Sequence, residues 1–309
     1  MMRGACRLAH EKVVDLVPVP HGAILRAGGY RVRCPAYTAA MDSITAFIGG
    51  GNMATALVGG LCRNGGAPGR ILVVDPEAAQ RARLRDDFGV RTLASADATL
   101  AEAGLVIWAV KPQLFKAAAE PVAGHATKAL HLSVMAGIRS DAIARATRSE
   151  RIVRAMPNTP ALIGQGISGL YARPAVSAPD RNAVEAVLAP TGRVLWVADE
   201  ADLDAVTALS GSGPAYVFYV AEALVNAAVG MGLGEAQGRE LALATLAGAT
   251  ALAQGSPEAL STLRERVTSK GGTTHAGLTV LQAEGVADAF GRAVQAARAR
   301  ARELGDEFG

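Results

Sequence analysis

Residues 44–54 constrain the fold of this chain more than any other stretch. Residues 44–48 read Ile-Thr-Ala-Phe-Ile, a short apolar run that is typical of a buried strand. Gly49, Gly51 and Ala54 follow with Gly-x-Gly-x-x-Ala spacing and lead into a helical run. In such a unit the first glycine makes a tight turn and the second lets backbone approach a pyrophosphate. The small third residue lets the helix pack on the strand. The pattern predicts a dinucleotide-binding site.

Further strands and helices alternate after this unit. A strand at residues 71–74 ends in Asp75, 21 residues after Ala54, where an acid can hold the ribose hydroxyls of an adenosine. The pattern then predicts a helix over 77–88 and strands over 105–110 and 130–134. This alternation indicates an α/β Rossmann domain with a doubly wound parallel sheet, whose loops meet at one edge. A glycine-rich turn in a Rossmann-like domain without cofactor is the alternative interpretation.

Two charged positions leave the cofactor chemistry open. The charge of Asp75 disfavours a 2′-phosphate and so favours NADH over NADPH. Three nearby arginines could still reach that phosphate, namely Arg70, Arg81 and Arg83. Lys111 follows the strand at 105–110 and precedes Pro112. It is either a catalytic lysine or, as the following proline favours, a residue that positions the loop or the cofactor.

A second glycine-rich stretch lies at residues 268–281. Gly271 and Gly272 leave the backbone bare, so a ligand can approach closely. Thr273 or Thr274 can cap a helix that begins there. A helix N-terminus with free N–H groups and hydroxyls favours a small anion such as a carboxylate or a phosphate. An ordinary capped turn is the alternative interpretation.

The C-terminal third of the chain predicts an all-α dimerisation domain. Helices over 214–230 and 235–253 carry small or apolar residues on nearly all sides, and a helix that is apolar all round must be buried. One chain of this size has few places to bury both helices, so we expect an intertwined homodimer. A shorter helix capped near Ser256 and an Arg-rich last helix over 288–304 complete the domain.

Charge and composition exclude several classes of function. The formal net charge is +3, and residues 1–42 account for it with six basic and three acidic residues. The remaining 25 basic and 25 acidic residues cancel, so the charge does not indicate a nucleic-acid partner. No apolar run reaches the ~18 residues of a membrane span. Three cysteines fit a reducing compartment, so we expect a cytoplasmic protein.

The chain divides into three segments in this interpretation. Residues 1–43 lack clear periodicity and are expected to be a disordered leader or an over-long assignment of the start. Residues 44–205 form the NAD(P)-binding Rossmann domain. Residues 206–309 form the helical domain for dimerisation and substrate binding. No metal site is expected.

Five segments together resemble the pyrroline-5-carboxylate reductase family. They are FIGGGNMA at 47–54, AVKPQ at 109–113, MPNTP at 156–160, LSGSGPAY at 209–216 and VTSKGGTTHAGLTVLQ at 267–282. The resemblance covers residues 44 to about 305. It implies a Rossmann domain followed by a helical dimerisation domain, with dimers that often assemble into decamers. The implied activity is NAD(P)H-dependent reduction of 1-pyrroline-5-carboxylate to L-proline, the last step of proline biosynthesis.

The resemblance also implies site residues, which add to those that spacing suggests. Spacing alone suggests Asp75 as a cofactor contact. The resemblance implies further cofactor contacts from Ile48, Gly49, Gly50, Gly51, Asn52, Met53, Ala109, Val110, Lys111 and Pro112. Substrate contacts are expected from Ser269, Gly271, Gly272, Thr273 and Thr274. Thr274 is the expected catalytic hydroxyl near the ring nitrogen.

One property of the family conflicts with a residue of this chain, and two residues depart from the usual family pattern. NADPH is the cofactor that the family generally prefers, in tension with Asp75. Lys270 stands where the family usually has proline, which adds a charge beside the anion site. Ala96 stands where an asparagine is common near the adenosine ribose.

Two other functions compete with this interpretation. A β-hydroxyacid dehydrogenase would require a catalytic lysine in the helical domain, whose only lysine is Lys270 in a glycine-rich turn. A non-catalytic, cofactor-binding regulator would be expected to lose the polar groups of the substrate segment. Ser269, Thr273 and Thr274 are all present, which favours the reductase.

Overall fold

The computed structural model describes residues 43–308, so the expected leader, apart from Ser43, lies outside the described residues. Its centre is an eight-stranded sheet in the order β3-β2-β1-β4-β5-β6-β7-β8. The strands are β1 (Ile44–Ile48), β2 (Ile71–Val74), β3 (Arg91–Leu93), β4 (Ala103–Trp108), β5 (Leu130–Ser133), β6 (Ile152–Met156), β7 (Gly166–Ala172) and β8 (Gly192–Trp196).

The first six strands are all parallel and lie in the order 3-2-1-4-5-6 of dinucleotide-binding domains. This confirms the expected doubly wound sheet. β7 then runs antiparallel to β6, and β8 runs parallel to β7. The carboxyl ends of β1, β2, β4 and β5 therefore share one edge, and the last two strands point the other way.

Helices cover both faces of the sheet, which explains why its strands are apolar runs without alternation. Phe47 points into one core, with α2 (Asn52–Arg63), α3 (Ala78–Phe88) and α6 (Ala178–Leu188). Ala46 points into the other core, with α4 (Phe115–Ala119) and α5 (Ser140–Thr147). Five short 3-10 turns connect these elements: η1 (Pro68–Arg70), η2 (Ala98–Glu102), η3 (Pro112–Leu114), η4 (Thr159–Ile163) and η5 (Ala189–Thr191).

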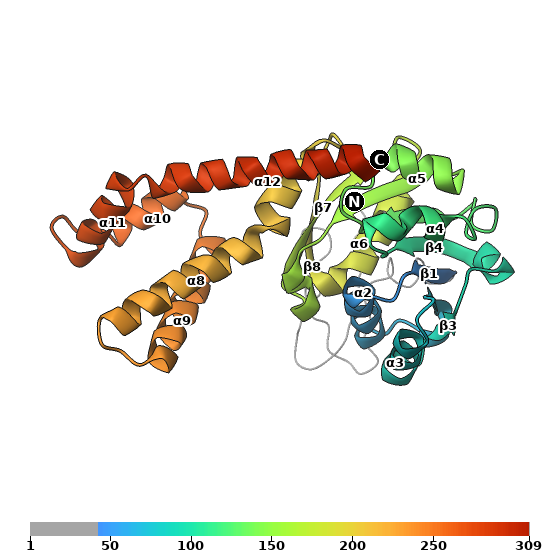
Figure 1. The fold of residues 1–309 in the computed structure, drawn as a ribbon, viewed down its shortest axis with the longest axis horizontal. Coiled ribbons are helices and arrows are strands. Elements are labelled where there is room, and N and C mark those ends of the chain that lie inside the picture. Colours follow the sequence, from blue (N-terminus) through green and yellow to red (C-terminus); the bar gives the residue numbers. More distant parts are fainter. Residues whose placement is uncertain (1–42, 309) are drawn as a thin grey trace, which may run out of the picture.

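Residues 202–308 form a helical arm that extends away from the Rossmann domain (Figure 1). Its elements are α7 (Asp202–Val206), the π-helical turn η6 (Thr207–Gly211), α8 (Gly213–Gly230), α9 (Glu235–Gln254), α10 (Leu260–Arg266), α11 (Thr273–Ala283) and α12 (Val286–Phe308). α8 and α9 run outward as a pair, and α12 runs back to the Rossmann domain. The C-terminal end of the arm therefore lies beside its base.

The apolar surface of the arm agrees with the expected pattern. Twenty large apolar side chains of residues 43–308 are exposed, and sixteen of them lie between residues 209 and 290. Only Ala221 and Ala228 of α8 are buried in the single chain, whereas Phe218 is 67% and Tyr219 72% exposed. A patch of this extent marks an interaction surface. Within residues 43–308, no helix combines the length and apolarity that crossing a membrane requires.

Several boundaries differ from the expected ones. β4 ends at Trp108, two residues before the expected end, and the turn at Lys111 follows. The sequence at 154–160 is rich in turn-forming residues and was interpreted as a turn segment, but residues 154–156 belong to β6. Ser256 does not cap α10, since its hydroxyl accepts from Glu258 N and Ala259 is the N-cap. The last helix is longer than expected and begins at Val286.

Candidate active site

Gly49 shapes the turn between β1 and α2 through its backbone. Its φ of +97° lies in the left-handed region, where side chains are disfavoured. A Cβ at Gly49 would stand 2.7 Å from the Ala109 carbonyl oxygen. The N–H of Gly49 donates to Val74 O at 2.8 Å. The position therefore requires glycine for packing between three strand ends, as the motif predicts.

Gly51 stands at the N-cap of α2 and faces open space. A Cβ built on it would meet nothing within 4 Å, and Gly51 and Asn52 are exposed. The first N–H groups of a helix have no partner within the helix and attract anions. Ala54 on the inner side is fully buried against the sheet. This part of the structure fits the pyrophosphate of a dinucleotide.

The acid at the end of β2 holds the glycine turn. Asp75 accepts from Gly50 N at 2.7 Å through Oδ2 and from Glu77 N at 2.9 Å through Oδ1. The Gly50 carbonyl in turn accepts from the side-chain amide of Gln80 on α3. Each carboxylate oxygen of Asp75 is thus already hydrogen-bonded to backbone, in addition to any contact with a ribose.

Arg81 brings a positive charge to the same end of β2. Its Nη1 donates to Asp75 O and to Pro76 O, each at 2.7 Å. Among the three arginines that the sequence offered for a 2′-phosphate, Arg81 is the one with contacts to the Asp75 backbone. The backbone contacts thus hold a guanidinium at the end of β2, beside Asp75.

The segment after β4 completes this edge of the sheet. Ala109 and Val110 are half-buried, Lys111 is exposed, and Pro112 begins η3. Ile48 and Gly50 are buried, so we expect their backbone atoms, not side chains, to face a cofactor. Met53 is half-buried in the first turn of α2. Every expected cofactor residue therefore lies at or beside the carboxyl edge of β1, β2 and β4.

The expected substrate residues form an exposed turn between α10 and α11. Gly271 has a φ of +74°, which favours glycine there. Gly272 is the N-cap of α11, with extended backbone, so neither Thr273 nor Thr274 is the cap. The two threonines instead occupy the first helical positions. Within the described residues the hydroxyls of Ser269, Thr273 and Thr274 have no hydrogen-bond partner, so all three are available to a ligand.

The two residues that depart from the family pattern have different surroundings. Lys270 is exposed beside the substrate turn, where its charge is free to act on an anion. Ala96 is half-buried against the core that includes α4 and α5, and it provides no polar side-chain group near the ribose.

The described chain does not bring the two halves of the expected site together. The N-terminus of α2 lies in the Rossmann domain, whereas α11 lies at the far end of the helical arm (Figure 1). The glycine turn at Gly51 and the substrate turn at Gly272 are therefore separated by the length of the arm. Within the described chain, the substrate turn therefore does not contact the cofactor edge.

Comparison with known proteins identifies the family. The model for pyrroline-5-carboxylate reductase dimerisation matches residues 200–304, and the model for coenzyme F420-dependent NADP oxidoreductases matches residues 44–137. The pyrroline-5-carboxylate reductase of Pseudomonas aeruginosa is 41% identical over 85% of this chain and 97% of its own length. This chain belongs to the pyrroline-5-carboxylate reductase family. The homologous enzyme of Haemophilus influenzae is 40% identical over 84% of this chain and 97% of its own.

Solved reductases of the family share the fold. The enzyme of Coxiella burnetii superposes with a TM-score of 0.79 at 36% identity, covering 85% of this chain and 98% of its own. The Plasmodium falciparum enzyme, solved with NADP bound, gives a TM-score of 0.76 at 26% identity, covering 86% and 99%. The resemblance and the fold class drawn from the sequence are confirmed, and family membership decides against the β-hydroxyacid dehydrogenase.

Sequence reasoning missed polar residues that contact the glycine turn and the base of the arm. Gln80 was not singled out, because a polar residue on a surface helix gives no signal of its contact with Gly50. Arg154 and Glu200 form an ion pair at 2.7 Å with side chains only 9% and 21% exposed. A charged residue inside an apolar strand is a signal that could have found Arg154, because such a charge must be paired.

Proposed function

We propose that this chain catalyses the NADPH-dependent reduction of 1-pyrroline-5-carboxylate to L-proline, the last step of proline biosynthesis. The observation that carries the proposal is the pair of open helix N-termini on the two glycine-rich segments that mark the family. α2 offers one at Gly51 for a cofactor, and α11 offers the other at Gly272 for a substrate anion.

The cofactor lies along the edge formed by Gly49–Met53 and Ala109–Pro112 in this proposal. NADPH is preferred over NADH because Arg81 stands where an arginine can accommodate a 2′-phosphate. The two hydrogen bonds that Asp75 accepts from backbone direct its carboxylate toward the glycine turn. The NADP-bound Plasmodium falciparum relative supports this choice. When bound, NADPH supplies the hydride that reduces the imine.

The substrate carboxylate binds at the N-terminus of α11. The hydroxyl of Ser269 and the backbone amides of Gly272–Thr274 are the donors, aided by the helix dipole. Lys270 adds a positive charge beside this carboxylate. We propose that the substrate turn contacts one face of the substrate ring and leaves the opposite face toward the cofactor edge.

Thr274 orients the ring through its nitrogen, with its hydroxyl as hydrogen-bond acceptor. The imine reacts in its protonated form: hydride joins the carbon, the π electrons move to nitrogen, and a secondary amine results. The nitrogen already carries its proton, so no acid is needed for this step. The protein contributes mainly proximity and orientation, which can supply ~7–11 kcal/mol.

The active unit is a homodimer in this proposal. The exposed apolar faces of α8 and α9 are buried against a second copy, and each substrate turn serves the cofactor edge of the other chain. Residues 44–205 act as the cofactor-binding domain and residues 206–309 as the dimerisation and substrate-binding domain. A decamer is the larger assembly that the family resemblance implies. We assign the protein to the cytoplasm, in keeping with its three cysteines.

A spectrophotometric assay tests the activity. Addition of 1-pyrroline-5-carboxylate should oxidise NADPH, with a higher kcat/KM than for NADH, and should yield proline in equal amount. The absence of proline with either cofactor would refute the reductase, and a preference for NADH would refute the role of Arg81.

Mixing two defective variants tests the shared site. Gly51→Val impairs the cofactor edge and Thr274→Ala the substrate turn, so mixed dimers should contain one intact site. Failure of mixed dimers to exceed either parent, with their formation verified, would refute sharing between chains.

A further inference from the structure

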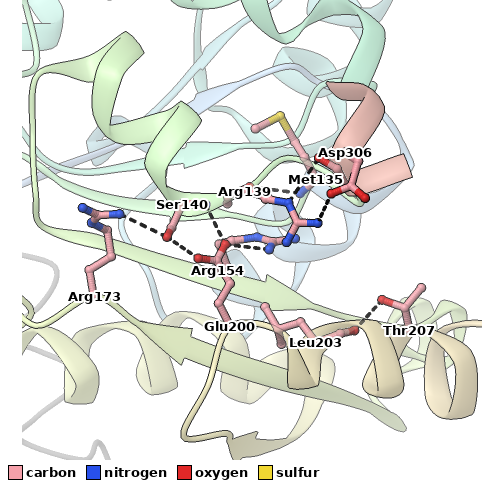
Figure 2. A network of polar contacts seen from close by, with 11 residues as sticks. Met135, Arg139, Ser140, Arg154, Arg173, Glu200, Leu203, Thr207 and Asp306 are labelled. Atoms are coloured by element: carbon pink, nitrogen blue, oxygen red, sulfur yellow. Dashed lines mark hydrogen bonds and ion pairs between the residues drawn. The ribbon is translucent and has the colours of Figure 1, made fainter. Parts of the chain in front are cut away.

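The helical arm joins the Rossmann domain at two places, and two adjacent residues of that domain each contact one of them. The chain enters the arm at α7 after leaving β8, and it returns along α12. Ser140 at the start of α5 contacts the entering segment, and Arg139 contacts the returning one (Figure 2). α12 also packs against α7 and η6, so the entering and returning segments support one another.

The first anchor is the carboxylate of Glu200, in the turn before α7. Its Oε1 accepts from Ser140 N at 2.6 Å and from Arg154 Nη1 at 2.7 Å, and its Oε2 accepts from Ser140 Oγ at 2.5 Å. The backbone carbonyl of Glu200 accepts from Leu203 N at 3.1 Å and so starts α7. One residue thus links the first turn of the arm to β6 and α5 of the Rossmann domain.

The Arg154 side chain makes this anchor strongly dependent on charge. It is 9% exposed, and its Nε is buried without a hydrogen-bond partner. Glu200 is the only ion-pair partner of Arg154 among the described residues. A buried charge that loses its partner is strongly unfavourable, so neutralising Glu200 should shift the turn rather than leave it in place.

The second anchor holds the end of α12. Arg139 Nη2 donates to Asp306 Oδ1 at 2.6 Å, and Arg139 Nε donates to Gly305 O at 3.3 Å. Gly137, with a φ of +75°, lies so close that a Cβ on it would stand 3.3 Å from Leu304 O. The last turns of the arm are therefore packed directly on the segment between β5 and α5.

That segment begins at the cofactor edge. It leaves β5 at Ser133, in register with Trp108 at the end of β4, and Met135 N donates to Ser133 Oγ at 3.3 Å. Within seven residues the chain passes from the carboxyl end of the sheet to Ser140. Arg139 and Ser140, which contact the two ends of the arm, thus lie where the loop from the proposed cofactor edge meets α5.

We propose that Glu200 and Arg139 are positioning residues for hydride transfer. They fix the angle between the arm and the Rossmann domain of the same chain. Because the arms of two chains pack together, this angle sets how closely the partner's substrate turn approaches the cofactor edge. The inference rests on the proposed function and on the shared site.

This arrangement makes an asymmetric prediction. The anchors of one chain govern the site that contains the Rossmann domain of that chain. They do not govern the site to which that chain lends only its substrate turn, since the two arms move together. A role in general stability would affect both sites alike.

Mixed dimers carrying two affinity tags separate these cases. One chain carries Gly51→Val and the other carries Thr274→Ala, so the single intact site uses the Rossmann domain of the Thr274→Ala chain. Glu200→Gln is then added to one chain or to the other. Asp141→Asn is the matched control, because Asp141 lies next to Ser140 on α5 and pairs with exposed Arg145 of the same helix. Arg139→Ala tests the second anchor in the same way.

Glu200→Gln in the Thr274→Ala chain should lower kcat about ten- to a hundred-fold, because small displacements of reacting groups have effects of that size. The Kd for NADPH should stay within about twofold, since the cofactor edge itself is unchanged. In the Gly51→Val chain the same substitution, like Asp141→Asn in either chain, should leave kcat within about twofold.

Equal loss in both placements, or no loss in either, would overturn the positioning role while leaving the proposed function intact. If the parent pair itself shows no complementation, the shared site fails and this inference fails with it. Dimer content, measured by light scattering on each sample, excludes loss of assembly as the cause.

Discussion

His131 is a buried histidine that should make the stability of this protein depend on pH. It lies on β5, fully buried, where Trp108 Nε1 donates to its Nδ1 at 3.1 Å. Its Nε2 therefore carries the proton and donates to Ala126 O at 3.1 Å. Burial lowers the pKa of His131 from 6.5 to about 4, because the charged ring would lose its hydration.

The sign of the effect follows from proton binding. Below pH 6.5 the unfolded chain protonates His131 while the folded chain does not, so acid favours unfolding. Full stability is present above about pH 6.5 and is lost progressively down to about pH 4. With 1.36 kcal/mol per unit, the loss is about 2 kcal/mol at about pH 5 and about 3 kcal/mol at about pH 4.

Thermal unfolding at fixed protomer concentration measures this loss. His131→Gln retains a donor and an acceptor but cannot titrate, and His125→Gln removes an exposed histidine from the same segment as a control. Between about pH 7.5 and about pH 5, the Tm of wild type and of the control should fall about 4–8 °C further than that of His131→Gln. Equal falls in all three proteins would refute the argument.

Other predictions concern the site and the assembly. Gly51→Val should raise the Kd for NADPH at least about tenfold with little change in Tm, because the side chain enters open space outside α2. Gly49→Ala should instead lower stability by about 1–3 kcal/mol, since its φ is +97° and Ala109 O blocks a Cβ. NADPH titration and thermal unfolding distinguish these outcomes. Thr274→Ala should lower kcat/KM roughly ten- to a hundred-fold, the ~1.5–3 kcal/mol of one hydrogen bond to a charged group. An unchanged kcat/KM would show that Thr274 serves only as a residue of the first turn of α11 and not in catalysis. Sedimentation at micromolar protomer concentration should give a dimer or a larger assembly, and a monomer would contradict the proposed interface.

Much of the fold was predictable because its signals are local. The glycine turn after β1, the acid after β2 and the apolar runs of β4 and β5 each lie within a few residues of sequence. The glycine spacing determines a strand–turn–helix unit, and parallel order follows from alternation with helices. The apolar circumference of α8 and α9 likewise predicted a surface that a single chain leaves exposed.

The elements that were missed depend on contacts distant in sequence. β7 is antiparallel to β6, and nothing local to Gly166–Ala172 indicates which neighbour it joins or in which direction. Local sequence did not identify β6, because Arg154 interrupts its apolar run and the partner that makes the burial of Arg154 tolerable is Glu200, 46 residues later. Asp75 was assigned to a ribose from spacing alone. Its hydrogen bond to Gly50 N depends on the packed arrangement of β1 and β2.

The placement of these distant contacts suggests why the chain retains a buried ion pair at the base of the arm. An apolar replacement of Arg154 and Glu200 could stabilise the fold equally well, since buried ion pairs offer little net stability. Apolar contacts, however, have weak directional preferences, whereas the three hydrogen bonds on Glu200 fix the orientation of the turn before α7. In the proposed site shared between two chains, the substrate turn comes from the partner, so this orientation sets how closely that turn approaches the cofactor edge. Charge at the base and apolar surface along the arm therefore have separate roles in this proposal: the first sets the angle between the arm and its own Rossmann domain, and the second holds two chains together.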